Sequence, residues 1–192
     1  SWPLVPGSVH PPGLAGRAAE LRMHPGELGL DDLRALVPDL QRIHPSDPRL
    51  SLLAKLLAQC ASVHNVATAL IADQKPWDCA MVFYETIDVV GHHFMQYYPP
   101  RMPHLSERDF ELFRHVIPGI YRLQDAMLGR LLELAGADAT VILLSDHGFH
   151  EYRRGLHVNQ WLHQNGFQEY VDGRTSGGDM LVHVDWSRTQ AY

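Results

Sequence analysis

The stretch Val141-Ile142-Leu143-Leu144-Ser145-Asp146-His147-Gly148-Phe149 decides the fold that the sequence predicts. Its first four residues are aliphatic without alternation, which is typical of a strand that is buried on both faces of a parallel sheet. Asp146 and His147 follow at the carboxyl end of this strand, and Gly148 lets the chain turn at once. Because ligands bind at the carboxyl ends of strands in open α/β sheets, we expect both side chains to reach one bound cation.

A second stretch repeats this pattern. The apolar run Cys79-Ala80-Met81-Val82-Phe83-Tyr84 has the length of a strand, and Asp88 and His92 follow it. If the chain after the strand becomes helical, the spacing of four residues places Asp88 and His92 on one helix face. Carboxylate oxygen and imidazole nitrogen together suit zinc, manganese or iron better than calcium. The sequence therefore predicts a transition-metal site to which two segments contribute.

Together these segments resemble a known family. The motif Tyr84-Glu85-Thr86-Ile87-Asp88-Val89-Val90-Gly91-His92, followed by Ser145-Asp146-His147-Gly148-Phe149, is similar to the metal-binding core of the alkaline phosphatase superfamily, in its type I phosphodiesterase/nucleotide pyrophosphatase branch. The resemblance extends from Trp77 to about Phe167. It implies two divalent metal ions, zinc in the first place and manganese as the alternative. Asp88 and His92 would bind one ion, and Asp146 and His147 the other.

The resemblance also implies a fold and a function. The expected fold is a three-layer α/β/α sandwich, with residues 76–192 as a partial alkaline phosphatase-like core and residues 1–75 as a connector and a mostly helical cap or insertion. The expected reaction is hydrolysis of phosphate diesters or pyrophosphates, with a small-molecule phosphate ester as substrate. Two alternatives stay open, a phosphonate or sulfate ester hydrolase of the same superfamily and a non-catalytic metal-binding or interaction domain.

The family's nucleophile is a Thr or Ser at a helix start, upstream of the Asp-x-x-x-His motif and after a strand that ends in a metal-binding Asp. Nothing before Trp77 resembles these elements. A further His ligand of the family lies far downstream of the Asp-His-Gly motif. We therefore interpret the chain as an internal piece of a larger enzyme that carries part of the metal ligands and no nucleophile, and we expect it to be inactive in isolation.

Four further residues are candidates for contact with substrate or for support of the metal ligands. Glu85 could orient a ligand imidazole, although it could equally shape the end of the strand. His150 and His157 follow the Asp-His-Gly motif and could approach substrate or metal, or lie on the surface. Arg154 could bind a phosphate group, although such an arginine is usually solvated.

Composition limits the partners. The formal net charge is −6 and the pI is about 6.1, so no basic surface for nucleic acid is evident. The 13 histidines favour metal chemistry.

Cys60 and Cys79 are interpreted as core residues rather than a disulfide. No apolar segment approaches the length of a membrane span. The compartment and the oligomeric state stay undetermined.

Periodicity and turn residues predict the remaining elements. The strongest prediction is a helix of about 24 residues that Asp47-Pro48 opens, with one apolar stripe from Leu50 to Ile71. Further helices are expected over residues 14–21, 30–37, 106–136 and 157–165, and Pro118 is expected to kink or split the helix of residues 106–136. Strands are expected over residues 77–84, 139–144, 167–171 and 180–184.

Overall fold

The computed structural model describes residues 7–73, 76–151 and 154–192. The described residues form two compact units. Unit 1 extends to Glu151, and unit 2 contains the residues from Arg154 to Tyr192. Within the described ranges, no helix combines the length and the apolar character that a membrane span requires.

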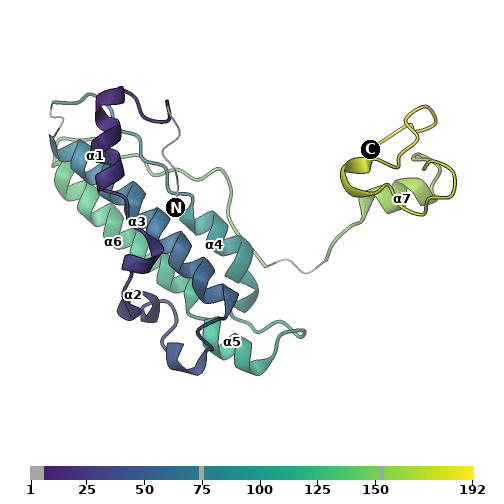
Figure 1. Cartoon of the computed structure of the whole chain (residues 1–192), viewed down its shortest axis with the longest axis horizontal. Coiled ribbons are helices and arrows are strands. Elements are labelled where there is room, and N and C mark those ends of the chain that lie inside the picture. Colours follow the sequence, from purple (N-terminus) through teal and green to yellow (C-terminus); the bar gives the residue numbers. More distant parts are fainter. Residues whose placement is uncertain (1–6, 74–75, 152–153) are drawn as a thin grey trace. The chain divides into compact units, whose positions relative to one another are not determined.

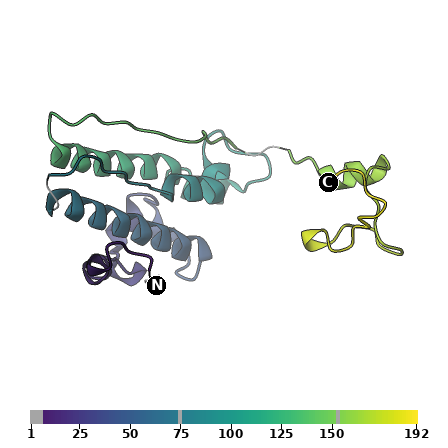
Figure 2. The ribbon, with the colours of Figure 1, turned by 90° about the horizontal axis from the view of Figure 1, so that it is seen from above.

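Unit 1 is built from helices, and its longest helices pack against one another. Helix α3 contacts both α4 and α6, and α4 and α6 contact each other (Figures 1 and 2). The α-helices of this unit are α1 (Ala15–Glu20), α2 (Leu30–Arg34), α3 (Pro48–Asp73), α4 (Thr86–Phe94), α5 (Glu107–Phe113) and α6 (Val116–Ala135). Short 3-10 turns are η1 (Pro12–Leu14), η2 (Pro25–Glu27), η3 (Leu40–Arg42) and η4 (Met95–Tyr97).

Helix α3 confirms the strongest sequence prediction. It has 26 residues, and the apolar positions spaced by three and four residues are buried along it, from Leu50 and Leu53 to Leu57 and Cys60. This stripe joins a core that residues 36–43, α4, α5 and α6 complete. The fully buried members of the core are Val37, Leu53, Val90, Phe113, Val116 and Ile120.

The segment from Ser106 to Ala135 is split into two helices, which is one of the two outcomes that the sequence predicts. Ser106 caps α5, because its Oγ accepts a hydrogen bond from the Asp109 backbone N–H at 3.0 Å. The break falls before Val116, not at Pro118. Pro118 consequently occupies the first turn of α6, where a missing N–H costs nothing because it would have no partner within the helix.

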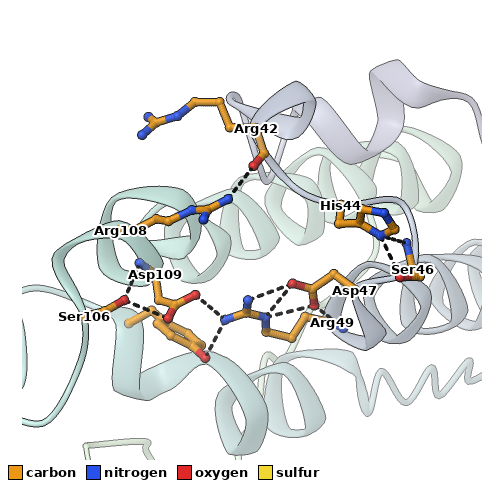
Figure 3. Close-up of polar contacts among 9 residues, drawn as sticks. Arg42, His44, Ser46, Asp47, Arg49, Ser106, Arg108 and Asp109 are labelled. Atoms are coloured by element: carbon orange, nitrogen blue, oxygen red, sulfur yellow. Dashed lines mark hydrogen bonds and ion pairs between the residues drawn. The ribbon is translucent and has the colours of Figure 1, made fainter.

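An ionic network ties the start of α3 to α5 (Figure 3). Arg49 donates from Nη2 to Asp47 Oδ2 at 2.7 Å and from Nη1 to Asp109 Oδ1 at 2.8 Å. The same Nη1 donates to the Tyr97 hydroxyl at 3.2 Å, and the guanidinium lies 4.2 Å from the centroid of the Phe113 ring. Arg49 therefore connects two helices through charge, hydrogen bonding and stacking on an aromatic ring.

The predicted three-layer α/β/α sandwich is wrong for the described structure. The apolar runs Cys79–Tyr84 and Ala139–Leu144 are not strands, and no sheet is present among the described residues. Phe83 is 80% exposed and Leu144 is 84% exposed, so these runs are not a buried layer. A strand needs the N–H and C=O groups of a neighbouring strand. The described chain offers these runs no such partner, while α3, α4 and α6 bury their apolar faces against one another.

Contacts in unit 1 cross the predicted boundary between residues 75 and 76, since α3 packs against α4 and α6. The observed boundary between compact units lies after Glu151. The functional division into a cap of residues 1–75 and a core of residues 76–192 stays a prediction.

Unit 2 contains α7 (Val158–Gln164) and the 3-10 turn η5 (Asp179–Leu181). Gly166 follows α7 with φ +77°, as a helix-terminating glycine does, which confirms the helix predicted over residues 157–165. The strands predicted over residues 167–171 and 180–184 do not form in the described residues. The two segments pair only through a single antiparallel bridge between Tyr170 and Val184. Tyr170 stacks on the His163 ring with centroids 4.0 Å apart and is buried.

Candidate metal centre

Asp88 and His92 lie on α4, as their spacing predicts. Asp88 occupies the first turn of the helix, and His92 follows one turn later. Their side chains face each other, with His92 Nε2 at 3.6 Å from Asp88 Oδ2. A carboxylate near a helix N-terminus is also favoured by the helix dipole, so Asp88 has a structural role as well as any role as a ligand.

The second motif returns to the same helix. After α6 the chain runs back as an extended segment to the side of α4 (Figure 2). There, Nε2 of His147 lies 3.7 Å from Asp88 Oδ1 and 3.6 Å from Asp146 Oδ2. The structure thus brings the four predicted ligands, from two segments far apart in the sequence, to one place in unit 1.

The turn around His147 orients its imidazole. The ring Nδ1 lies 3.0 Å from the Gly148 carbonyl oxygen. Because a carbonyl oxygen only accepts hydrogen bonds, this contact requires the ring proton on Nδ1. The backbone N–H of His147 donates to Asp146 Oδ1 at 3.1 Å, and the Ser145 hydroxyl donates to the His147 carbonyl at 2.5 Å. With the proton on Nδ1, Nε2 presents a lone pair toward the two carboxylates. A ring nitrogen in this state is a metal ligand.

The electrostatics of the cluster favour a cation. Oδ1 of Asp88 is buried and has no hydrogen-bond partner among the described residues, a condition that is costly for a carboxylate oxygen. Separations of 3.6 to 3.7 Å are too long for hydrogen bonds. Within each expected ligand pair, His92 with Asp88 and His147 with Asp146, the separation of 3.6 Å is close to the spacing of two donors that each lie about 2.0 to 2.2 Å from one ion.

The cluster is not a finished coordination sphere. Among the described residues, no three or more His, Cys, Asp or Glu side chains are arranged so that they could hold one metal ion. The outer side is open, since the Asp146 side chain is 88% exposed. The assignment of the four residues as metal ligands therefore stays a prediction.

Comparison with known families agrees with both motifs. The profile of the family described as type I phosphodiesterase / nucleotide pyrophosphatase matches residues 32–191, which include α3, α4, α6 and α7. The chain belongs to this family. The resemblance seen in the two motifs is thereby confirmed, and it extends further along the chain than the motifs suggested. No curated protein and no solved structure matches the chain.

The other four candidate residues of this phosphodiesterase-family chain are all exposed. Glu85 is the N-cap residue of α4 and is exposed. His150 is exposed and places Nδ1 at 2.8 Å from Glu151 Oε2. Arg154 and His157 belong to unit 2, both exposed, with His157 at the N-cap of α7. Their predicted roles at a substrate or behind a ligand stay predictions.

Sequence reasoning missed a second polar pair in unit 1. His64 on α3 places Nδ1 at 2.8 Å from the Tyr84 hydroxyl. Burial raises the pKa of Tyr84 to about 12 and lowers the pKa of His64, so both side chains are held neutral near pH 7. The pattern of α3 contains a weak signal for this pair, a histidine close to the apolar stripe.

Sequence reasoning also missed Gly91 and Phe149, although both stand inside the quoted motifs. The Phe149 ring lies edge-on to the His92 ring with centroids 5.0 Å apart, and it packs against the backbone at Gly91. A glycine in the interior of a predicted helix, one residue before a predicted ligand, was the available signal, because glycine there destabilises a helix unless close packing requires it.

Proposed function

We propose that this chain binds two divalent metal ions and uses them in the hydrolysis of phosphate diesters or pyrophosphates. Asp88 and His92 would hold one ion, and Asp146 and His147 the other, with zinc as the expected metal and manganese as the alternative. Membership of the type I phosphodiesterase / nucleotide pyrophosphatase family supports the reaction class. The substrate is accordingly a small phosphate ester.

One observation carries the proposal. The buried Oδ1 of Asp88 lacks a hydrogen-bond partner among the described residues, and Nε2 of His147, from the other motif, lies 3.7 Å from it. The two carboxylates of the cluster contribute negative charge. Divalent cations would neutralise these charges and supply the missing partner of Oδ1.

The chain's residues and the metals would divide the chemistry. Bound divalent ions polarise phosphoryl oxygens and lower the pKa of a coordinated water or hydroxyl. Asp88 and Asp146 supply negative charge to hold the ions. The Gly148 carbonyl orients the His147 ring so that Nε2 faces the two carboxylates. None of the four side chains is a hydroxyl nucleophile. We therefore propose that this chain by itself binds metal weakly and turns over substrate poorly.

Titration calorimetry with Zn²⁺ and with Mn²⁺ tests the metal-binding part of the proposal. Asp88→Asn and Asp146→Asn keep the side-chain shape but remove the charge. Each is expected to weaken metal binding by more than about 10-fold. Loss of a residue that only supports a metal ligand already weakens binding by about 10-fold, and loss of a ligand itself should weaken it more. His93→Gln is the matched control, because His93 is an exposed neighbour of His92 on α4. Wild-type affinity in both Asp variants would contradict the assignment.

Hydrolysis of bis(p-nitrophenyl) phosphate by the metal-loaded chain tests the reaction. Slow turnover that disappears in Asp88→Asn and Asp146→Asn but persists in His93→Gln is the expected result. Faster hydrolysis of a p-nitrophenyl sulfate or phosphonate ester would instead place the chain with another activity of the superfamily. Metal binding without hydrolysis of any of these esters would favour a non-catalytic metal-binding domain.

A further inference from the structure

The aromatic ring of Phe149 lies directly on the backbone of α4. A Cβ atom added to Gly91 would stand 2.9 Å from Cδ2 and 2.9 Å from Cε2 of this ring, closer than real Cβ contacts come. Gly91 is buried and Phe149 is half-buried. Only a hydrogen atom fits between the helix and the ring, so glycine at position 91 is a steric requirement of this contact.

The same ring contacts both predicted imidazole ligands. It meets the His92 ring edge-on, with centroids 5.0 Å apart and an interplanar angle of 90°, and its centroid lies 6.5 Å from that of His147. Both separations are within the range of favourable aromatic contacts. Phe149 therefore contacts one imidazole ligand of each proposed ion.

Little else attaches the turn of residues 145–149 to α4. The hydrogen bonds of Ser145, His147 and Gly148 are made inside the turn. In the described part of the chain, no backbone hydrogen bond joins the segment of residues 140–149 to α4. The aliphatic residues before the turn are exposed, Leu144 to 84%. The contact of Phe149 with Gly91 is thus the apolar attachment of the turn.

We infer that Phe149 and Gly91 are positioning residues, which dock the turn with Asp146 and His147 onto α4 beside Asp88 and His92. This inference rests on the proposed metal function. Docking brings the two halves of the metal centre together, and the distance of 3.7 Å between His147 Nε2 and Asp88 Oδ1 is its consequence. A residue that holds a metal ligand in place affects metal affinity although it does not touch the metal itself.

The test compares Co²⁺ binding, followed by visible absorption that reports ligand number and geometry, in four variants of the full chain. Gly91→Ala pushes the ring away, and Phe149→Ala removes it. Each is expected to weaken Co²⁺ binding by about 10-fold to 100-fold and to alter the absorption bands. Phe149→Leu, which keeps an apolar contact, is expected to lose less. The double variant Gly91→Ala/Phe149→Ala should bind no more weakly than Phe149→Ala, because both changes break one contact.

Two controls separate positioning from general damage. Gly129→Ala adds a methyl group to a helix glycine with nothing within 4 Å, and Phe83→Ala removes a phenylalanine that is 80% exposed. Both should bind Co²⁺ as the wild type does. Wild-type affinity in Gly91→Ala and Phe149→Ala, or additive losses in the double variant, would overturn the inference.

A readout without metal keeps the two proposals distinguishable. In the wild type, the Phe149 ring should shift the NMR signals of the His92 ring protons, and Phe149→Ala should remove that shift. A wild-type chain that binds no Co²⁺ but shows this shift would contradict the proposed function and leave the docking contact intact. A chain that binds Co²⁺ but shows no such shift would contradict the docking contact alone.

Discussion

Nε2 of His147 lies 3.7 Å from Oδ1 of Asp88, and this oxygen has no hydrogen-bond partner in the described part of the chain. The two residues come from different motifs, one in the first turn of α4 and the other in the turn that follows the extended segment after α6. A lone pair and a desolvated carboxylate oxygen repel each other unless a proton or a metal ion lies between them. The pair is therefore the place where added cation should have its largest effect.

Metal should stabilise the folded chain through this pair. At a free concentration of 100 times the dissociation constant, Zn²⁺ or Mn²⁺ is expected to raise the free energy of unfolding by about 2.7 kcal/mol. Asp88→Asn and His147→Gln should remove most of the increase, and His93→Gln should keep it. Thermal denaturation with and without metal measures the effect. An equal increase in all variants would indicate binding elsewhere, for example to other members of the 13 histidines.

The sequence was sufficient for the parts of this molecule that local spacing controls. The repeat of apolar residues from Leu50 to Cys60 defines α3, and the spacing of Asp88 and His92 places both on one face of α4. The order of the two motifs identified the family, and the structure brings their side chains together. These features depend on residues close in the chain or on a motif whose chemistry constrains its sequence.

The sheet could not be predicted in the same way. An apolar run such as Val141–Leu144 reports only that its side chains avoid water, and whether it becomes a strand depends on pairing with other segments. In this structure Ile142 is 73% exposed and Leu143 is 79% exposed, whereas the helices bury Val90 and Ile120 fully. The contact of Gly91 with Phe149 was also beyond local reasoning, because it joins segments that only the folded chain brings together.

Arg49 should contribute much more to stability than an exposed arginine does. Its side chain is 30% exposed and binds Asp47 and Asp109 at once, while it lies over the Phe113 ring. Arg49→Met is expected to lower the free energy of unfolding by about 2 kcal/mol, between the values for exposed and buried ion pairs. Arg34→Met is the control, since the Arg34 pair with Asp31 is 50% and 93% exposed and should contribute less than about 0.5 kcal/mol. Urea denaturation measures both, and equal losses would contradict the network.

The same network should make stability depend on pH. Hydrogen bonds from Arg49 lower the pKa of Asp47. The pKa of Asp109 is lowered most by the hydrogen bond from the Ser106 hydroxyl and next by the hydrogen bond from Arg49. In the unfolded chain both carboxyls have a pKa of about 3.9. A carboxyl with a lowered pKa stabilises the fold above its unfolded pKa, and this stabilisation is lost as pH falls through the folded pKa.

Asp109→Asn tests this dependence. The free energy of unfolding of the wild type should exceed that of the variant at pH 7 and at pH 5, since Asp109 is charged there. Below about pH 4 the difference should shrink, because a protonated Asp109 resembles Asn. Urea denaturation across this range measures it. A difference that stays constant down to pH 3 would contradict the assigned direction of the pKa of Asp109.

Two glycines of α6 should respond in opposite ways to the same substitution. A Cβ atom at Gly119 would stand 2.5 Å from Leu36 Cδ2 and 3.2 Å from the Ala35 carbonyl oxygen, while nothing lies within 4 Å of a Cβ at Gly129. Gly119→Ala must displace core and backbone atoms, so it should lower the free energy of unfolding by about 1 to 3 kcal/mol. Gly129→Ala meets open space and removes the flexibility of glycine from a helix interior, so it should raise the free energy of unfolding by about 0.5 to 1 kcal/mol. Thermal and urea denaturation of the two variants measure the contrast. Equal effects of the two substitutions would mean that Gly119 of α6 does not pack against Ala35 and Leu36.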